Sequence, residues 1–390
     1  MSSSPARAQW RLTLAGLSGS LVGIGLSRFA YTPLLPAIIA AGWFDPAGGA
    51  YLGAANLAGY LLGALVAGKL SRRFETVTIL RASMVLATAA FFAGAFPLNF
   101  AWYFVWRFIA GFSGAGIIVL GATSILPHVP PSRRGLVSGA IFMGIGLGIV
   151  AAGTLVPLLL RLGLMETWLG LGLVALVLTA IAWNGWPKQA APGPASGPAA
   201  PAAPSGLLAL RALYLEYGLN AASLVPHMIF LVDYVARGRG EGLQAGAFHW
   251  VLFGLGAIVG PLVGGTVADR IGFRRALRLA FILQAIAVSI PAFGPGAIAL
   301  MVSSAVVGAA VPGIVALVLG RVHELLPHAP AQQKTAWSRA TTSFAVFQAA
   351  GAYGMSYLFE RTGGHYATLF AVAAGAVVLA LLIDLVAARR

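Results

Sequence analysis

Long runs of apolar residues, separated by short polar segments, form the main pattern of this sequence. A helix needs roughly 20 apolar residues to cross about 30 Å of hydrocarbon at about 1.5 Å per residue. A membrane β-barrel would instead show short segments in which apolar and polar residues alternate. The pattern therefore predicts an all-α membrane protein with twelve transmembrane helices, at 12–41, 49–69, 76–96, 100–124, 136–160, 167–186, 207–235, 245–268, 276–293, 297–320, 336–358 and 366–387.

A segment without large apolar residues divides these spans into two sets of six. It runs from Pro187 to Ser205 and consists mainly of Pro, Ala, Gly and Ser. Such a segment cannot pack a core, so it is predicted to be a linker. We expect an N-terminal six-helix bundle at 1–186, a linker at 187–205 and a C-terminal six-helix bundle at 206–390.

The composition excludes a soluble enzyme and a disordered chain. Hydrophobic residues make up 59% of the 390 residues and charged residues only 9%, against about 45–50% and 25% in soluble domains. The chain contains no cysteine, which excludes disulfides, thiolate metal sites and thiol nucleophiles. It also lacks a phosphate-binding GxxxxGK[ST] loop, and its histidines lack zinc spacing. We expect neither an enzyme nor a cofactor or metal.

Basic residues predict the orientation in the membrane. Lys and Arg are retained in cytoplasmic loops, and most of the 25 basic residues fall on one side of the predicted spans. The opposite loops hold only Arg161, Arg237, Arg239 and Arg361. Both termini and the linker are therefore expected in the cytoplasm. The net charge of +15 is spread over membrane loops and does not form a patch for nucleic acid.

The two sets of spans echo each other in sequence. The segment LPHVP at 126–130 ends the fourth span, and LPHAP at 326–330 ends the tenth, about 200 residues later. The pair Arg72-Arg73 after the second span has a counterpart in Arg274-Arg275 after the eighth. These offsets indicate a duplicated six-helix unit, as in many secondary transporters that build a central site from two halves.

One loop motif carries a family resemblance. The segment GTVADRIGFRR at 265–275 joins the eighth and ninth spans and resembles the loop signature of the major facilitator superfamily. A glycine allows close approach of helices or a tight turn, and an Asp can accept hydrogen bonds from helix N-termini or arginines. The resemblance thus implies a cytoplasmic gate, formed by Gly265, Asp269, Arg270, Gly272, Arg274 and Arg275.

The first span carries a more specific resemblance. The segment GIGLSRFAYTPLLP at 23–36 is similar to the opening signature of the bacterial YbfB/YjiJ-type branch of this superfamily, and FLVDYVAR at 230–237 fits the same branch. The resemblance implies a bacterial inner-membrane transporter, which we expect to act as a monomer. It does not imply a substrate.

Two arginines lie inside predicted spans, where each costs about 2.5–3.5 kcal/mol on insertion scales and therefore suggests a function. Arg28 in the first span and Arg107 in the fourth reach similar depths, and the family lines its central cavity with the first, fourth, seventh and tenth spans. Both, with Tyr31, are candidate substrate contacts, because arginine binds a carboxylate with two hydrogen bonds. Alternatively, Arg107 caps backbone carbonyls and Arg28 pairs with a dipole.

The seventh and tenth spans offer the facing candidates. Tyr217, Asn220 and Ser303 are further candidate substrate contacts. Glu216 is the best candidate for a carboxyl group that exchanges a proton in each cycle, since burial favours its neutral form; the alternative is a hydrated group at the membrane interface. His227 is either a second proton-coupling group or a hydrogen-bonded gate residue.

Glycines repeat in the fifth span, at Gly139, Gly144, Gly146, Gly148 and Gly153. They resemble a motif of proton-coupled drug antiporters, but close packing of helices explains them better.

The sequence thus predicts a secondary transporter of the major facilitator type that moves a small organic anion by alternating access with proton coupling. The alternatives are efflux of hydrophobic drugs or metabolites by proton antiport and, in another class, a membrane sensor or scaffold that transports nothing.

Overall fold

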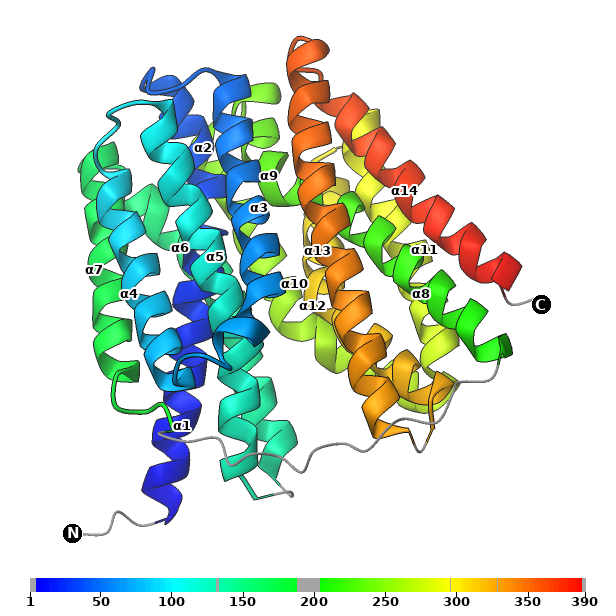
Figure 1. Ribbon diagram of the computed structural model, residues 1–390. Coiled ribbons are helices and arrows are strands. Elements are labelled where there is room, and N and C mark those ends of the chain that lie inside the picture. Colours follow the sequence, from blue (N-terminus) through cyan, green and yellow to red (C-terminus); the bar gives the residue numbers. More distant parts are fainter. Residues whose placement is uncertain (1–4, 131–132, 188–203, 295, 328, 388–390) are drawn as a thin grey trace. The chain divides into compact units, whose positions relative to one another are not determined.

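The chain folds into two compact helical units. The structure is a computed structural model that describes all residues except 1–4, 131–132, 188–203, 295, 328 and 388–390. Every regular element among the described residues is a helix (Figure 1). The N-terminal unit contains Met1–Gly193 and Val235–Val251, and the C-terminal unit contains Pro194–Tyr234 and Leu252–Arg390. Most of the predicted linker lies outside the described residues.

The helices of the first half of the chain carry the first six spans. They are α1 (Pro5–Ser20), the π-helix η1 (Leu21–Leu26), α2 (Tyr31–Ala40), α3 (Pro46–Leu70), α4 (Thr76–Gly94), α5 (Phe100–Ile125), the short 3₁₀-helix η2 (Leu126–His128), α6 (Arg134–Leu159) and α7 (Leu164–Ala182). Span one therefore comprises α1, η1 and α2, and the other spans are single helices.

The helices of the second half carry the last six spans. They are α8 (Pro204–Ser223), α9 (Val225–Asp233), the π-helix η4 (Tyr234–Gly238), α10 (Gly242–Ile271), α11 (Phe273–Ser289), the 3₁₀-helix η5 (Ile290–Phe293), α12 (Ala297–Leu325), α13 (Pro330–Arg361) and α14 (Tyr366–Ala387). The segment Val235–Val251, which the sequence assigns to the C-terminal bundle, belongs to the N-terminal unit by its contacts.

The helices have the length and composition of membrane spans. Eleven helical segments in the described part of the chain are long and apolar enough to cross a bilayer. Large apolar side chains lie on their outer surfaces, for example Leu262, which is 70% exposed, and Ile298, which is 78% exposed. The eleventh predicted span, 336–358, lies within α13, a long helix that is not among these eleven and carries polar residues along its length. The protein is thus a multi-pass membrane protein.

Two of the predicted spans are interrupted rather than continuous. In span one, α1 passes into η1, where Ser27 N–H donates to Val22 O over 3.1 Å, and a turn at 27–30 precedes α2. In span seven, α8 ends at Ser223 and α9 begins at Val225. Pro226 accounts for the second break, because it has no N–H for a helical hydrogen bond. Interrupted helices in transporters expose backbone groups near binding sites.

Glycines bring neighbouring helices into backbone contact. A Cβ at Gly111 would lie 1.8 Å from the carbonyl oxygen of Asn56, which locks α5 against α3. A Cβ at Gly308 would lie 2.0 Å from the carbonyl oxygen of Phe253, which does the same for α12 and α10. In the fifth span a Cβ at Gly144 would lie 2.4 Å from the carbonyl oxygen of Leu17. At Gly144, this confirms the prediction that the glycines of the fifth span allow close packing of helices.

Candidate functional site

Arg107 lies at the centre of a polar network in the N-terminal unit. Its side chain is only 6% exposed. Its Nη1 donates to the carbonyl of Ser27 over 2.8 Å, in the turn that interrupts span one, and its Nε donates to the carbonyl of Leu52 over 3.3 Å. Its Cζ lies 4.2 Å from the ring centre of Tyr31, a favourable cation–π distance. This geometry corresponds to the alternative in which Arg107 caps backbone carbonyls. Its hydrogen bonds stabilise the chain where span one is interrupted.

Arg28 and Tyr31 flank this network. Arg28 is half-buried, and its Cζ lies 4.3 Å from the ring centre of Tyr60 on α3. The Tyr31 hydroxyl donates to the carbonyl of Gly49 over 2.7 Å. The guanidinium groups of Arg28 and Arg107 lie within electrostatic reach of each other. The structure therefore brings the three N-terminal candidates together around the break in span one.

The candidates of span seven point into the C-terminal unit. The Tyr217 ring stacks on α13, with its centre 6.3 Å from Trp337 and 4.6 Å from Phe344. The amide of Asn220 donates to Gln284 Oε1 on α11 over 2.6 Å. These side chains are at most 2% exposed, so they are packed among the helices of their own unit.

His227 and Ser303 form a second contact in the same unit. His227 Nε2 lies 3.0 Å from Ser303 Oγ on α12, and the Ser303 hydroxyl donates to the carbonyl of Ala287 over 2.6 Å. The His227 ring also meets the ring of Phe370 edge-on, with centres 5.1 Å apart. His227 is fully buried, which makes it a hydrogen-bonded interior residue.

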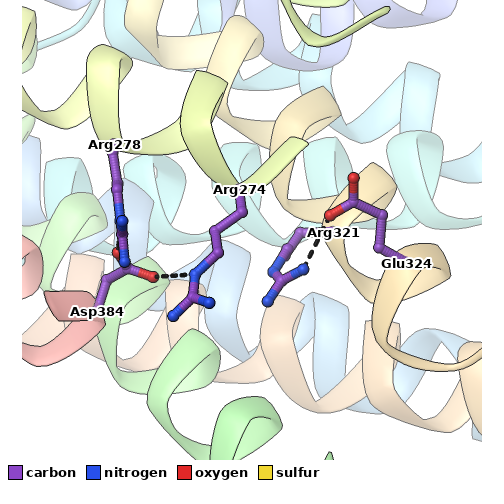
Figure 2. Close-up of polar contacts among 5 residues, drawn as sticks. All are labelled: Arg274, Arg278, Arg321, Glu324 and Asp384. Carbon is purple, nitrogen blue, oxygen red and sulfur yellow. Dashed lines mark hydrogen bonds and ion pairs between the residues drawn. The ribbon is translucent and has the colours of Figure 1, made fainter. Parts of the chain in front are cut away.

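Several charged side chains of the C-terminal unit lie within electrostatic reach of Glu216. Figure 2 shows a cluster of charges to which they belong. Arg278 on α11 donates to Asp384 on α14, and Arg274 Nε lies 3.6 Å from the same carboxylate. Arg321 pairs with Glu324 over 2.9 Å, both on α12. We refer to these five residues, Arg274, Arg278, Arg321, Glu324 and Asp384, as the charge cluster.

Glu216 is 3% exposed and within electrostatic reach of Arg274, Arg278, Arg321 and Asp384. The interpretation of Glu216 as a hydrated interfacial group is therefore wrong. Helices α12, α13 and α14 pack against α8, which carries Glu216, and a single sequence does not show this cover. The cluster residues Asp384, Arg278 and Arg321 were not among the predicted site residues.

The predicted gate residues have different surroundings. Gly272 has φ +82°, so the tight turn between α10 and α11 requires a glycine. Arg274 contributes to the charge cluster, whereas Asp269, Arg270 and Arg275 are exposed. A Cβ at Gly265 would meet nothing within 4 Å. The expectation of close helix approach at Gly265 is therefore wrong. Gly260 and Gly256, which precede it on α10, lie in backbone contact with α12 and serve that purpose.

Comparison with known proteins identifies the family. The model of one family matches residues 20–385 and is described as "Uncharacterised MFS-type transporter YbfB". The chain belongs to this family. It is a transporter of the major facilitator type and not an enzyme. The resemblance based on the motifs at 23–36 and 265–275 is confirmed.

Solved structures show the same fold. A mutant of the nucleoside transporter NupG has a TM-score of 0.76 at 15% identity, over 97% of this chain and 99% of that chain. The D-xylose-proton symporter has a TM-score of 0.72 at 13% identity, over 96% of this chain and 97% of that chain. At these identities the likeness establishes the fold alone.

A shorter sequence match involves curated proteins. Organic anion transporter 3 of Homo sapiens and that of Pongo abelii are each 38% identical to this chain over 85 residues. The match covers 22% of this chain and 16% of each of those proteins, so this chain aligns with only a small part of their length.

Proposed function

We propose that this protein is a secondary active transporter that carries a small organic anion across the bacterial inner membrane by alternating access, coupled to protons. Both termini then lie in the cytoplasm, as the distribution of basic residues indicates. The observation that carries the proposal is the pair of guanidinium groups, Arg28 and Arg107, beside the break in span one. Two cations inside an apolar unit favour an anionic ligand.

The two arginines have different roles in this proposal. Arg107 donates to two backbone carbonyls and faces Tyr31, so it holds the interrupted helix in place. Arg28 is half-buried on the face of Tyr60 and is the residue that grips the carboxylate of the substrate. The short match to organic anion transporter 3 supports the same substrate class.

The C-terminal unit supplies the coupling group. Glu216 is a carboxyl group buried beside arginines, and it can lose and regain a proton in each cycle without breaking the ion pairs of the charge cluster. Transport of an anion together with protons is then the chemistry that the two units support.

A flux assay tests the proposal. The purified protein in proteoliposomes is offered radiolabelled mono- and dicarboxylates, with and without an imposed pH gradient. We expect saturable uptake of at least one carboxylate that the gradient accelerates, and Arg28→Ala should reduce its rate at least 100-fold. The matched control is Arg161→Ala, since Arg161 is an exposed loop arginine, and it should transport normally.

Two outcomes would contradict this proposal. Wild-type flux in Arg28→Ala would exclude the anion site. Absence of flux with carboxylates, amines and hydrophobic drugs alike would favour a sensor or scaffold. Drug efflux has little structural support, because Gly144, which suggested it, is in backbone contact with Leu17 of α1.

A further inference from the structure

A stripe of buried polar residues runs along span seven. Glu216, Asn220, Ser223 and His227 are separated by four, three and four residues, the spacing that places side chains on one helical face. None is more than 3% exposed. Each buried polar group needs a hydrogen-bond partner. Four such groups on one face of an apolar span therefore suggest a function in addition to packing.

The hydrogen bonds of His227 determine which of its ring nitrogens carries the proton. The single hydroxyl proton of Ser303 is donated to the carbonyl of Ala287. Ser303 Oγ can therefore only accept from His227, so Nε2 carries the proton and Nδ1 is a bare acceptor. Nδ1 is buried and has no hydrogen-bond partner among the described residues.

The same reasoning applies to Asn220. Its amide group donates to Gln284 Oε1 over 2.6 Å, and Gln284 Nε2 donates to Ser223 Oγ over 2.8 Å. The Ser223 hydroxyl donates to the backbone carbonyl of Asn220 over 2.6 Å. These bonds use one N–H of each side-chain amide and the hydroxyl proton of Ser223. Asn220 Oδ1 is a second buried acceptor to which no described residue donates.

The two buried acceptors, Asn220 Oδ1 and His227 Nδ1, can bind only a group that donates a hydrogen bond. An anion has no proton to donate, so the partner must be a donor such as water, and buried water usually bridges polar groups of this kind. Asn220 and His227 are about 10 Å apart along the helix, a distance that a chain of two or three waters spans at about 2.8 Å per hydrogen bond.

We infer that span seven carries an internal, water-mediated proton path within the C-terminal unit, from Glu216 past Asn220 to His227. The inference rests on the proposed proton-coupled function and specifies its route. In each transfer a proton leaves the carboxyl group of Glu216, passes along the waters by exchange of O–H bonds, and binds the lone pair of His227 Nδ1. The products are a Glu216 carboxylate and a His227 imidazolium; the return step reverses both changes.

The surroundings of Glu216 permit this exchange. From α11 it faces Arg274 and Arg278, from α12 Arg321, and from α14 Asp384. Because Asp384 already pairs with Arg274 and Arg278, a neutral Glu216 leaves neither cation without a carboxylate. When Glu216 is ionised, the same arginines stabilise it.

The surroundings of His227 are different. From α12 it meets Ser303, and from α14 the ring of Phe370. From α13, Gln348 contacts Met228, the residue next to His227. His227 therefore receives a proton in an apolar environment, from which it is readily returned.

Transport measurements with two variants test the path. His227→Gln keeps a donor for Ser303 but cannot carry a proton, and Asn220→Leu removes the acceptor. In proteoliposomes with an internal pH dye, we expect the ratio of protons to substrate moved to fall at least tenfold in both. The control is Ser356→Ala, which removes a fully buried hydroxyl that donates to the carbonyl of Ala352 in its own helix, and its ratio should equal that of the wild type. A wild-type ratio in His227→Gln would overturn the path, and so would equal losses of proton and substrate flux.

A spectroscopic measurement separates the path from the proposed function. In full-length protein with ¹⁵N-histidine, the His227 signals are assigned by their loss in His227→Gln. We expect an unprotonated Nδ1 that receives magnetisation from water and a protonated Nε2. A protonated Nδ1, or no transfer from water, would refute the path even if the protein transports. If no substrate moves in any assay, this result still decides whether the hydrated path exists.

Discussion

The two units use an equivalent arginine in different ways. Arg81 near the start of α4 donates from Nε and Nη2 to the carbonyl of Trp183, over 2.9 and 2.7 Å, and lies 4.9 Å from the centre of the Trp183 ring. Arg278 near the start of α11 binds the carboxylate of Asp384 instead. Both contacts tie the third span of a unit to the end of the sixth.

The difference lies in what each partner can do. A backbone carbonyl and an indole ring are neutral, so the contact of Arg81 with Trp183 is a cation bound to uncharged groups. The partner of Arg278 is a charged carboxylate, which lies within electrostatic reach of a second carboxyl group, Glu216. The N-terminal contact thus joins an arginine to neutral groups, and the C-terminal contact joins an arginine to a carboxylate within the charge cluster.

The largest expected effects concern a feature that both units share. Gly111→Ala and Gly308→Ala each place a Cβ about 2 Å from a backbone carbonyl of the neighbouring helix, which cannot move without shifting that helix. We expect each to lower the free energy of unfolding by about 3 kcal/mol, measured as loss of thermal stability in detergent.

The control for these variants is Gly354→Ala. A Cβ at Gly354 would meet nothing within 4 Å, and alanine favours the helix by about 1 kcal/mol. This variant should therefore be as stable as the wild type or slightly more so. If Gly111→Ala were tolerated and Gly308→Ala were not, close backbone packing would not be a property common to both units.

The next effect should distinguish the units. Asp384→Asn leaves two arginines beside a neutral amide, and we expect a loss of about 2 kcal/mol, between the values for exposed and buried ion pairs. Arg81→Gln should cost about 1 kcal/mol, because it loses hydrogen bonds to one neutral carbonyl. Both are measured by thermal or chemical unfolding.

A double-mutant cycle sharpens this contrast. Arg278→Gln combined with Asp384→Asn should show a coupling energy of about 1 kcal/mol or more, since each side chain is the partner of the other. Arg81→Gln combined with Trp183→Leu should show about 0.5 kcal/mol, because only the ring contact is shared. Equal coupling energies would remove the distinction between a contact to neutral groups and an ion pair.

The smallest effect compares the starts of α4 and α11. Glu324 Oε1 accepts from the backbone N–H of Phe273 over 2.9 Å at the start of α11. Glu75 at the start of α4 makes no such side-chain bond. Glu324→Gln should therefore lower stability by about 0.5 kcal/mol and Glu75→Gln by almost nothing, as measured by unfolding in low salt. A larger effect of Glu75→Gln would contradict the asymmetry.

Much of the fold follows from the sequence because lipid imposes a simple rule on helices. The span predicted at 366–387 has the bounds of α14, and the motif at 265–275 gave the family. The break in span one was not predicted, because Gly23 and Gly25 suit helix packing and helix interruption equally well. Both glycines do lie against neighbouring helices.

The site could be predicted only in part. Arg28 and Arg107 are visible as charges within apolar spans, but the partners of Arg107 are backbone carbonyls, for which side chains give no signal. Gln284 and Asp384 were missed although a signal exists: each is a rare polar residue within an otherwise apolar predicted span. Their partners depend on how the helices pack, and a single sequence does not specify this.

The wide turn of η1 has a consequence for how the substrate contacts could change. A π-helix accommodates one residue more per turn than an α-helix does, so the chain after Leu26 is rotated by about 100° relative to an uninterrupted helix. Deletion of a single residue within 21–26 could let span one close into a regular helix. The side chains of Arg28 and Tyr31 would then point to another side of the span. Their direction therefore depends on the one extra residue that η1 contains.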